Sequence, residues 1–102
     1  MENITVDEVK KRMDAGEQLI LVDVREPHEH EEFSIGGVLY PLGHIQAMDI
    51  EDLEPYKDKE IILYCRSGNR SGQAAMILEM MGFSNTKNLT GGMLGWQEKF
   101  GR

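Results

Sequence analysis

The chain has 102 residues, which is enough for one ordinary domain with its own hydrophobic core. Its formal net charge of -7 argues against a nucleic-acid surface, and no apolar run approaches the ~20 residues that a membrane-spanning helix needs. Because one cysteine cannot form an intramolecular disulfide and the N-terminus carries no secretion signal, we expect a cytoplasmic protein.

The first part of the chain predicts a helix followed by a strand. Thr5 and Glu8 have the spacing of a capping box, which predicts a helix over residues 6–15. Residues 19–24 are apolar up to Asp23, as is typical of a buried parallel strand.

The middle of the chain predicts shorter elements. Proline is tolerated in a first helical turn, so Pro27 favours a short helix over residues 28–33. Residues 38–40 follow a pair of glycines and form a second candidate strand. Apolar residues between positions 41 and 60 are spaced for one or two short helices on the sheet.

The last part of the chain alternates between strand and helix. Strands are predicted over residues 60–64 and 86–89, and helices over residues 71–81 and 93–100. This alternation implies a parallel sheet with helices on both faces. In such sheets ligands bind beyond the carboxyl ends of the strands.

Four large apolar side chains are interpreted as structural. Met76, Met80 and Met81 lie at helical spacing and are expected in the core. Trp96 is expected to anchor the last helix, with the mouth of a site as the alternative.

The histidines do not predict a metal site. His28, His30 and His44 lack a companion Cys or Glu at ligand spacing. The acidic segment around the first two of them is expected to be a solvated surface that includes Glu29, Glu31 and Glu32.

Cys65 lies between an apolar strand and an apolar helix, in a turn rich in small residues. The free N–H groups at a helix start stabilise an anion such as a thiolate. We expect them, with Arg66 and Arg70, to lower the pKa of Cys65 and make it a nucleophile. Considered without this context, a lone cysteine is more often a small apolar core residue.

Three short motifs stand in order along the chain: Asp23-Val24-Arg25-Glu26-Pro27, then Cys65-Arg66-Ser67-Gly68-Asn69-Arg70-Ser71, then Gly91-Gly92 with Trp96. Together they resemble the signatures of the rhodanese (thiosulfate sulfurtransferase) family. The resemblance covers essentially the whole chain and implies one rhodanese domain over residues 1–102. It also implies a three-layer α/β fold, with a mostly parallel sheet of about five strands between helices.

The resemblance implies a reaction in which Cys65 takes a sulfane sulfur from thiosulfate or a similar donor. The persulfide then passes that sulfur to cyanide or a thiol, such as that of a thioredoxin-like protein, without a cofactor. The implied binding residues are those of the loop: Arg66, Ser67, Gly68, Asn69, Arg70 and Ser71. Asp23 and Arg25 are expected to support the loop through ion pairs.

The spacing of the loop argues against phosphatase chemistry. Phosphatases with a Cys-x5-Arg loop have a larger cradle for tetrahedral phosphate, whereas Cys65 and Arg70 are separated by a Cys-x4-Arg spacing that favours a single sulfur atom. The family often has a histidine where Ser34 stands, and we do not transfer the role of that residue to His44.

Two other functions remain as alternatives to a thiosulfate sulfurtransferase. One is a persulfide relay that moves sulfur between partner proteins with little activity on free thiosulfate. The other is a catalytically inert regulatory domain, which the retained Cys65 disfavours.

Overall fold

The computed structural model describes residues 1–102, and a single sheet forms its centre. The strands are β1 (Glu2–Ile4), β2 (Leu21–Asp23), β3 (Val38–Leu39), β4 (Glu60–Tyr64) and β5 (Asn85–Leu89). The helices are α1 (Val6–Asp14), α2 (Pro27–Glu32), α3 (Leu42–Gln46), the 3-10 helix η1 (Glu51–Tyr56), α4 (Asn69–Met80) and α5 (Gly92–Phe100). All five strands are parallel, in the order β1-β5-β4-β2-β3, so the predicted fold class is confirmed.

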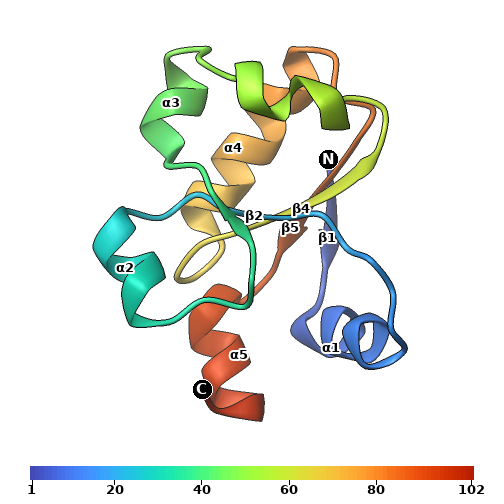
Figure 1. The fold of residues 1–102 in the computed structure, drawn as a ribbon, viewed down its shortest axis with the longest axis vertical. Coiled ribbons are helices and arrows are strands. Elements are labelled where there is room, and N and C mark those ends of the chain that lie inside the picture. Colours follow the sequence, from blue (N-terminus) through green and yellow to red (C-terminus); the bar gives the residue numbers. More distant parts are fainter.

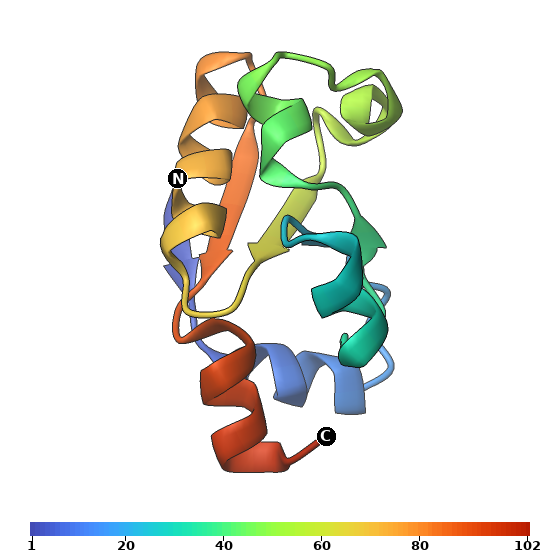
Figure 2. The same cartoon turned by 90° about the vertical axis from the view of Figure 1, so that its left-hand side faces the viewer.

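The central strand β4 contributes to a core on each face of the sheet. Ile61, Leu63 and Cys65 point to one face, where they pack with side chains from α3, η1 and α4. Ile62 and Tyr64 point to the other face, toward side chains from α1 and α5. Figures 1 and 2 show α3 and η1 above the strands and α1 and α5 below them, and in Figure 2 α4 runs alongside β5.

The register of the sheet positions the candidate site. β2 and β4 are neighbours, and Asp23 pairs with Tyr64 at their carboxyl ends. The chain therefore leaves the sheet at the same edge in both strands, which brings Arg25 and Cys65 close to each other.

Helix α1 begins as the sequence predicts. The Thr5 hydroxyl oxygen accepts a hydrogen bond from the Glu8 N–H at 3.1 Å. Val6 and Val9 are buried against the sheet. The helix ends at Asp14, one residue earlier than expected.

The short strand β1 was not predicted from the sequence. It has three residues, and Ile4 is the only buried one, so it carries no apolar alternation. Its pairing with β5, in which Glu2 is opposite Lys87, places it at the edge of the sheet. The pattern was too short to separate this strand from a loop.

The predicted core position is wrong for Met76 and Met80, which are 57% and 86% exposed. Met81, the C-cap of α4, is partly buried and packs against the core as predicted. The face of α4 that contacts the sheet consists mainly of small residues: Ser71, Ala74, Ala75 and Leu78. These small side chains allow the helix to approach the strands closely, and Met76 and Met80 are left on its outer side.

No helix combines the length and the apolar character that a membrane crossing requires.

Candidate active site

The turn between β4 and α4 places Cys65 at the carboxyl edge of the sheet, as expected. Gly68 is the N-cap of α4, with a φ of 108° that a glycine adopts without strain. Its N–H donates a hydrogen bond to Cys65 Sγ at 3.0 Å. The helix begins at Asn69, two residues before the predicted start at Ser71, so its first N–H groups belong to the loop itself.

The surroundings of Cys65 favour its thiolate form. The residue is 1% exposed, and burial by itself raises the pKa of a thiol. Hydrogen bonds from the Ser71 hydroxyl and from the N–H groups of Ser71, Gly68 and Ser67 outweigh this effect, so the pKa of Cys65 lies below its usual value. Neither arginine of the loop is among the main causes, contrary to the sequence-based expectation.

Helix α5 holds the loop from the other side. The N–H of Met93 donates to the Cys65 carbonyl at 2.9 Å, and the N–H of Leu94 donates to the Arg66 carbonyl at 3.0 Å. Because a trans peptide points its C=O and N–H in opposite directions, these bonds turn the N–H groups of Arg66 and Ser67 away from α5. The start of α5 therefore helps to orient the amides around the sulfur.

Gly92 is the residue that allows this contact. Its φ is 54°, in the left-handed region. A Cβ atom there would lie 2.5 Å from the carbonyl oxygen of Cys65 and 2.6 Å from that of Arg66. Gly92 of the third motif thus has a defined packing role in this chain.

Ser71 and Asn88 form a buried polar pair behind the thiol. Ser71 Oγ lies 3.4 Å from Cys65 Sγ and 2.5 Å from Asn88 Oδ1. Asn88 Nδ2 donates to the Gly68 carbonyl at 3.2 Å. Sequence analysis missed Asn88, although an amide near the carboxyl end of a buried strand was an available signal.

The two arginines of the loop have different surroundings. Arg70 donates two hydrogen bonds to the Glu29 carboxylate, at 2.8 and 2.9 Å. These bonds, against the opposing effect of burial, lower the pKa of Glu29 to about 2. Arg66 is exposed and makes no ion pair, so it is the cation of the loop that is free to meet an anion.

Helix α2 is tied to the site by buried charges. Arg25 donates to both carboxylate oxygens of the fully buried Asp23, at 2.9 and 2.8 Å, and to the Phe33 carbonyl at 2.5 Å. His30 Nδ1 lies 2.8 Å from the same carboxylate. Arg25 thus pairs with Asp23 as expected, but the group that it holds is the end of α2 rather than the loop.

The expectation that Glu29 and His30 are solvated surface residues is wrong. Both are partly buried: His30 lies against Asp23 at the end of β2, and Glu29 pairs with Arg70 at the start of α4. In the sequence these residues looked like part of an exposed acidic segment, because their partners lie in other segments of the chain. His28, Glu31 and Glu32 are exposed as expected.

The other singled-out residues lie outside the loop. Trp96 is buried in the core below the sheet, with its ring edge-on to Phe100 at 5.0 Å between centroids. His44 is exposed and pairs with Asp49 at 3.2 Å. No three His, Cys, Asp or Glu side chains are grouped so that they could hold a metal ion.

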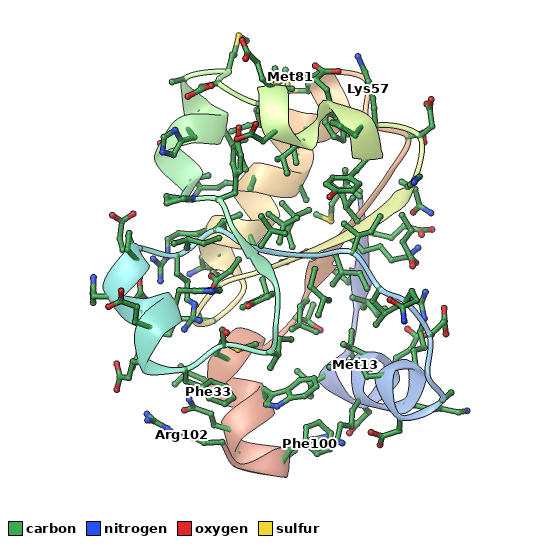
Figure 3. All side chains as sticks on the ribbon, viewed as in Figure 1. Met13, Phe33, Lys57, Met81, Phe100 and Arg102 are labelled. Atoms are coloured by element: carbon green, nitrogen blue, oxygen red, sulfur yellow. The ribbon has the colours of Figure 1, made fainter.

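A groove of about 320 Å³ lies beside the loop, between α2 and α5. Arg66 and Arg25 line it, together with the side chains of Phe33 and Leu94. Figure 3 shows Phe33 and Arg102 side by side near α5, and the guanidinium carbon of Arg102 lies 5.9 Å from the Phe33 ring. Met81 and Lys57 are at the opposite end of the molecule. The groove gives Arg66 an open approach from solvent.

Comparison with known proteins identifies the family. The model of the rhodanese-like domain matches residues 5–99. The chain belongs to the rhodanese-like domain family. The rhodanese assignment made from the three motifs is therefore confirmed, and sulfur transfer is the general activity of the relatives named below.

Relatives and a solved structure agree with this assignment. YtwF of Bacillus subtilis, by its name a candidate sulfurtransferase, is 38% identical over 99 residues, covering 95% of this chain and 91% of that protein. A candidate mitochondrial thiosulfate sulfurtransferase of Schizosaccharomyces pombe is 35% identical, covering 89% and 72%. The crystal structure of a rhodanese-like domain protein from Staphylococcus aureus is 28% identical with a TM-score of 0.82, covering 94% and 91%.

Proposed function

We propose that this rhodanese domain is a thiosulfate sulfurtransferase that carries sulfur as a persulfide of Cys65. The observation that supports the proposal most is the position of Cys65 Sγ, which accepts hydrogen bonds from the Gly68 N–H and the Ser71 hydroxyl at the start of α4. These donors favour an anionic sulfur in a buried place, which is what a thiolate nucleophile requires. A reducing compartment such as the cytoplasm would keep this thiol free.

In the first half-reaction the Cys65 thiolate attacks the outer sulfur of thiosulfate. A bond forms between Sγ and that sulfur, and the bond to the sulfonate sulfur breaks, so sulfite leaves with the electron pair. Arg66 is the free cation that would attract the donor and stabilise the departing sulfite. The loop amides of Ser67 and Gly68 would hold the persulfide, together with Ser71.

In the second half-reaction an acceptor removes the outer sulfur. Cyanide or a thiolate attacks it, the bond between the two sulfurs breaks, and the electron pair returns to Cys65 Sγ. The cycle uses no cofactor, and the two half-reactions predict ping-pong kinetics. The groove beside Arg66 gives both small acceptors and thiols on proteins, such as thioredoxin-like ones, a route to the loop.

The experiment incubates the protein with thiosulfate and cyanide and measures thiocyanate. We expect turnover in the wild type and none above background in Cys65→Ser. Intact mass after thiosulfate treatment should increase by one sulfur atom in the wild type only. If neither thiocyanate nor the added sulfur appears in correctly folded protein, the thiosulfate form of the proposal is wrong.

A persulfide relay between partner proteins is the second candidate. The ion pair of Arg70 with Glu29 supports it, because that pair leaves Arg66 as the only free cation of the loop for a dianionic donor. A neutral or monoanionic persulfide donor needs less positive charge. Sulfur on Cys65 after mixing with a persulfide-bearing protein, together with negligible thiosulfate turnover, would favour this function.

A further inference from the structure

The Ser71 hydroxyl faces two hydrogen-bond acceptors but has one proton. Its oxygen lies 2.5 Å from Asn88 Oδ1 and 3.4 Å from Cys65 Sγ. All three residues are buried, so water is not available to donate a hydrogen bond to the second acceptor. The hydroxyl therefore donates to one of the two acceptors at a time.

The orientation of the Asn88 amide follows from its other contact. Nδ2 lies 3.2 Å from the Gly68 carbonyl oxygen and donates to it. A flipped amide would place its oxygen against that carbonyl oxygen, so that two acceptors would face each other. The unflipped amide thus presents Oδ1 to Ser71, and the 2.5 Å distance favours a Ser71 proton between the two oxygens as long as Cys65 is a neutral thiol.

This arrangement depends on the protonation state of Cys65. A neutral thiol can donate its own proton to the free lone pair of Ser71 while Ser71 donates to Asn88. When the thiol ionises, Ser71 can stabilise the anion only by turning its proton toward Sγ. The turn breaks the bond to Asn88 and leaves two oxygens facing each other at a short distance, which opposes ionisation.

We propose that Asn88 is a positioning residue that competes with Cys65 for the Ser71 hydroxyl proton and so sets the fraction of Cys65 present as thiolate. The inference deepens the proposed function, because the thiolate is both the nucleophile of the first half-reaction and the leaving group of the second. Asn88 restrains thiolate formation. A thiol with a less depressed pKa is the more reactive nucleophile once it is ionised.

The test is a double-mutant cycle read out as the pH midpoint of Cys65 alkylation by iodoacetamide. Asn88→Ala should lower the midpoint by about half to one pH unit, because the hydroxyl is then free for the sulfur. Ser71→Ala should raise the midpoint. In the Ser71→Ala background, the Asn88→Ala change should leave the midpoint unmoved.

The double-mutant cycle distinguishes an effect of Asn88 on the Ser71 proton from an effect of Asn88 on the structure of the loop. If Asn88→Ala acts through the lost bond to the Gly68 carbonyl, it shifts the midpoint equally in both backgrounds, and the proposal is overturned. A midpoint that stays constant or rises in Asn88→Ala overturns it as well. Asn88→Leu is a second variant, which keeps the branching at Cγ but has no acceptor and should lower the midpoint in the same way.

Alkylation needs no sulfur donor or acceptor. A failure of the inference therefore appears in the midpoints, whereas a failure of the proposed function appears in the thiocyanate and mass measurements.

Discussion

At Cys65, burial and hydrogen bonding act on the pKa of the thiol in opposite directions. Burial opposes ionisation, whereas the Ser71 hydroxyl and the loop amides favour it and prevail. The charged side chains of the loop contribute less because one of them, Arg70, is already paired with Glu29. The reactivity of this cysteine therefore depends mainly on the Ser71 hydroxyl and the loop amides rather than on charged side chains.

The lowered pKa of Cys65 predicts a specific pH dependence. The thiolate fraction rises with pH, so alkylation by iodoacetamide should accelerate with a midpoint below that of the same thiol in the unfolded chain. The matched reference is the same chain in denaturant, where the hydrogen bonds are absent. Equal midpoints for the folded and the unfolded chain would contradict the hydrogen-bond account.

Replacing Glu29 tests the ion pair with Arg70. Glu29→Gln keeps the shape of the side chain but frees the charge of Arg70 for the donor. We expect the KM for thiosulfate to fall by about three- to tenfold with little change in kcat, since one exposed charge contributes about 1 kcal/mol. Glu31→Gln, on the exposed side of the same helix, is the control. A fall in kcat with an increased KM would instead mean that Glu29 mainly maintains the loop.

At the scale of elements, the site depends on how α2 and α5 contact the two strand ends. Helix α5 contributes N–H groups at its start, and α2 contributes carboxylate and imidazole groups along one face. Neither helix carries the nucleophile. Each restrains the loop through bonds between parts of the chain that are distant in sequence.

Gly92→Ala tests the contact of α5 with the loop. The new Cβ meets two carbonyl oxygens of the loop, in a backbone conformation that costs a non-glycine residue about 1–3 kcal/mol. We expect a drop of that size or more in the free energy of unfolding, and at least a tenfold loss of kcat. Gly101→Ala is a close control, because Gly101 has a φ of 75° at the other end of α5 but no atom within 4 Å of a Cβ. If both variants behave alike, the contact with the loop is unimportant.

Sequence reasoning predicted those parts of the elements that depend on local pattern. The Thr5 cap, the apolar run of β4 and the turn at Cys65 are encoded by adjacent residues and were confirmed. The pairing of Glu29 with Arg70 depends on two residues that lie 41 positions apart, so no local pattern revealed it. The prediction that Met76 and Met80 face the core was wrong, because the size and polarity of side chains alone do not tell which side of a helix contacts the sheet.

At the scale of the whole molecule, a charged network joins the first strand and helix to the centre of the sheet. Arg12 of α1 donates to both Glu60 oxygens, at 3.1 and 2.5 Å, and Lys87 of β5 donates to the same carboxylate at 2.8 Å. Glu2 of β1 lies 3.6 Å from Lys87. The network connects α1, β4 and β5 through partly buried groups, and the exposed Glu2 links β1 to it.

This network predicts how stability depends on pH. The Arg12 and Lys87 bonds, against the effect of burial, lower the pKa of Glu60 from about 4.5 to about 2. A carboxyl group with a depressed folded pKa stabilises the fold above its unfolded pKa, and that contribution is lost as the pH falls toward 2. We expect the free energy of unfolding, measured with urea, to decrease by about 1–2 kcal/mol between pH 5 and pH 2.5 on account of Glu60.

Glu60→Gln should make the urea midpoint less sensitive to acid than in the wild type. Glu98→Gln, which replaces an exposed carboxylate outside the network, should leave the acid sensitivity unchanged. If the wild type and Glu60→Gln lose stability in parallel, the acid response arises elsewhere in the chain.

The near-complete burial of Cys65 also bears on which sulfur of a persulfide an acceptor would reach. With 1% of the residue exposed, the inner sulfur of a persulfide would be shielded by the loop, while the outer sulfur would lie one bond further from the Cys65 side chain. Attack on the outer sulfur completes the transfer, whereas attack on the inner one would leave the acceptor bound to the protein as a mixed disulfide. The same packing that hides the thiol would therefore confer regioselectivity and protect the protein from being trapped by its own acceptors.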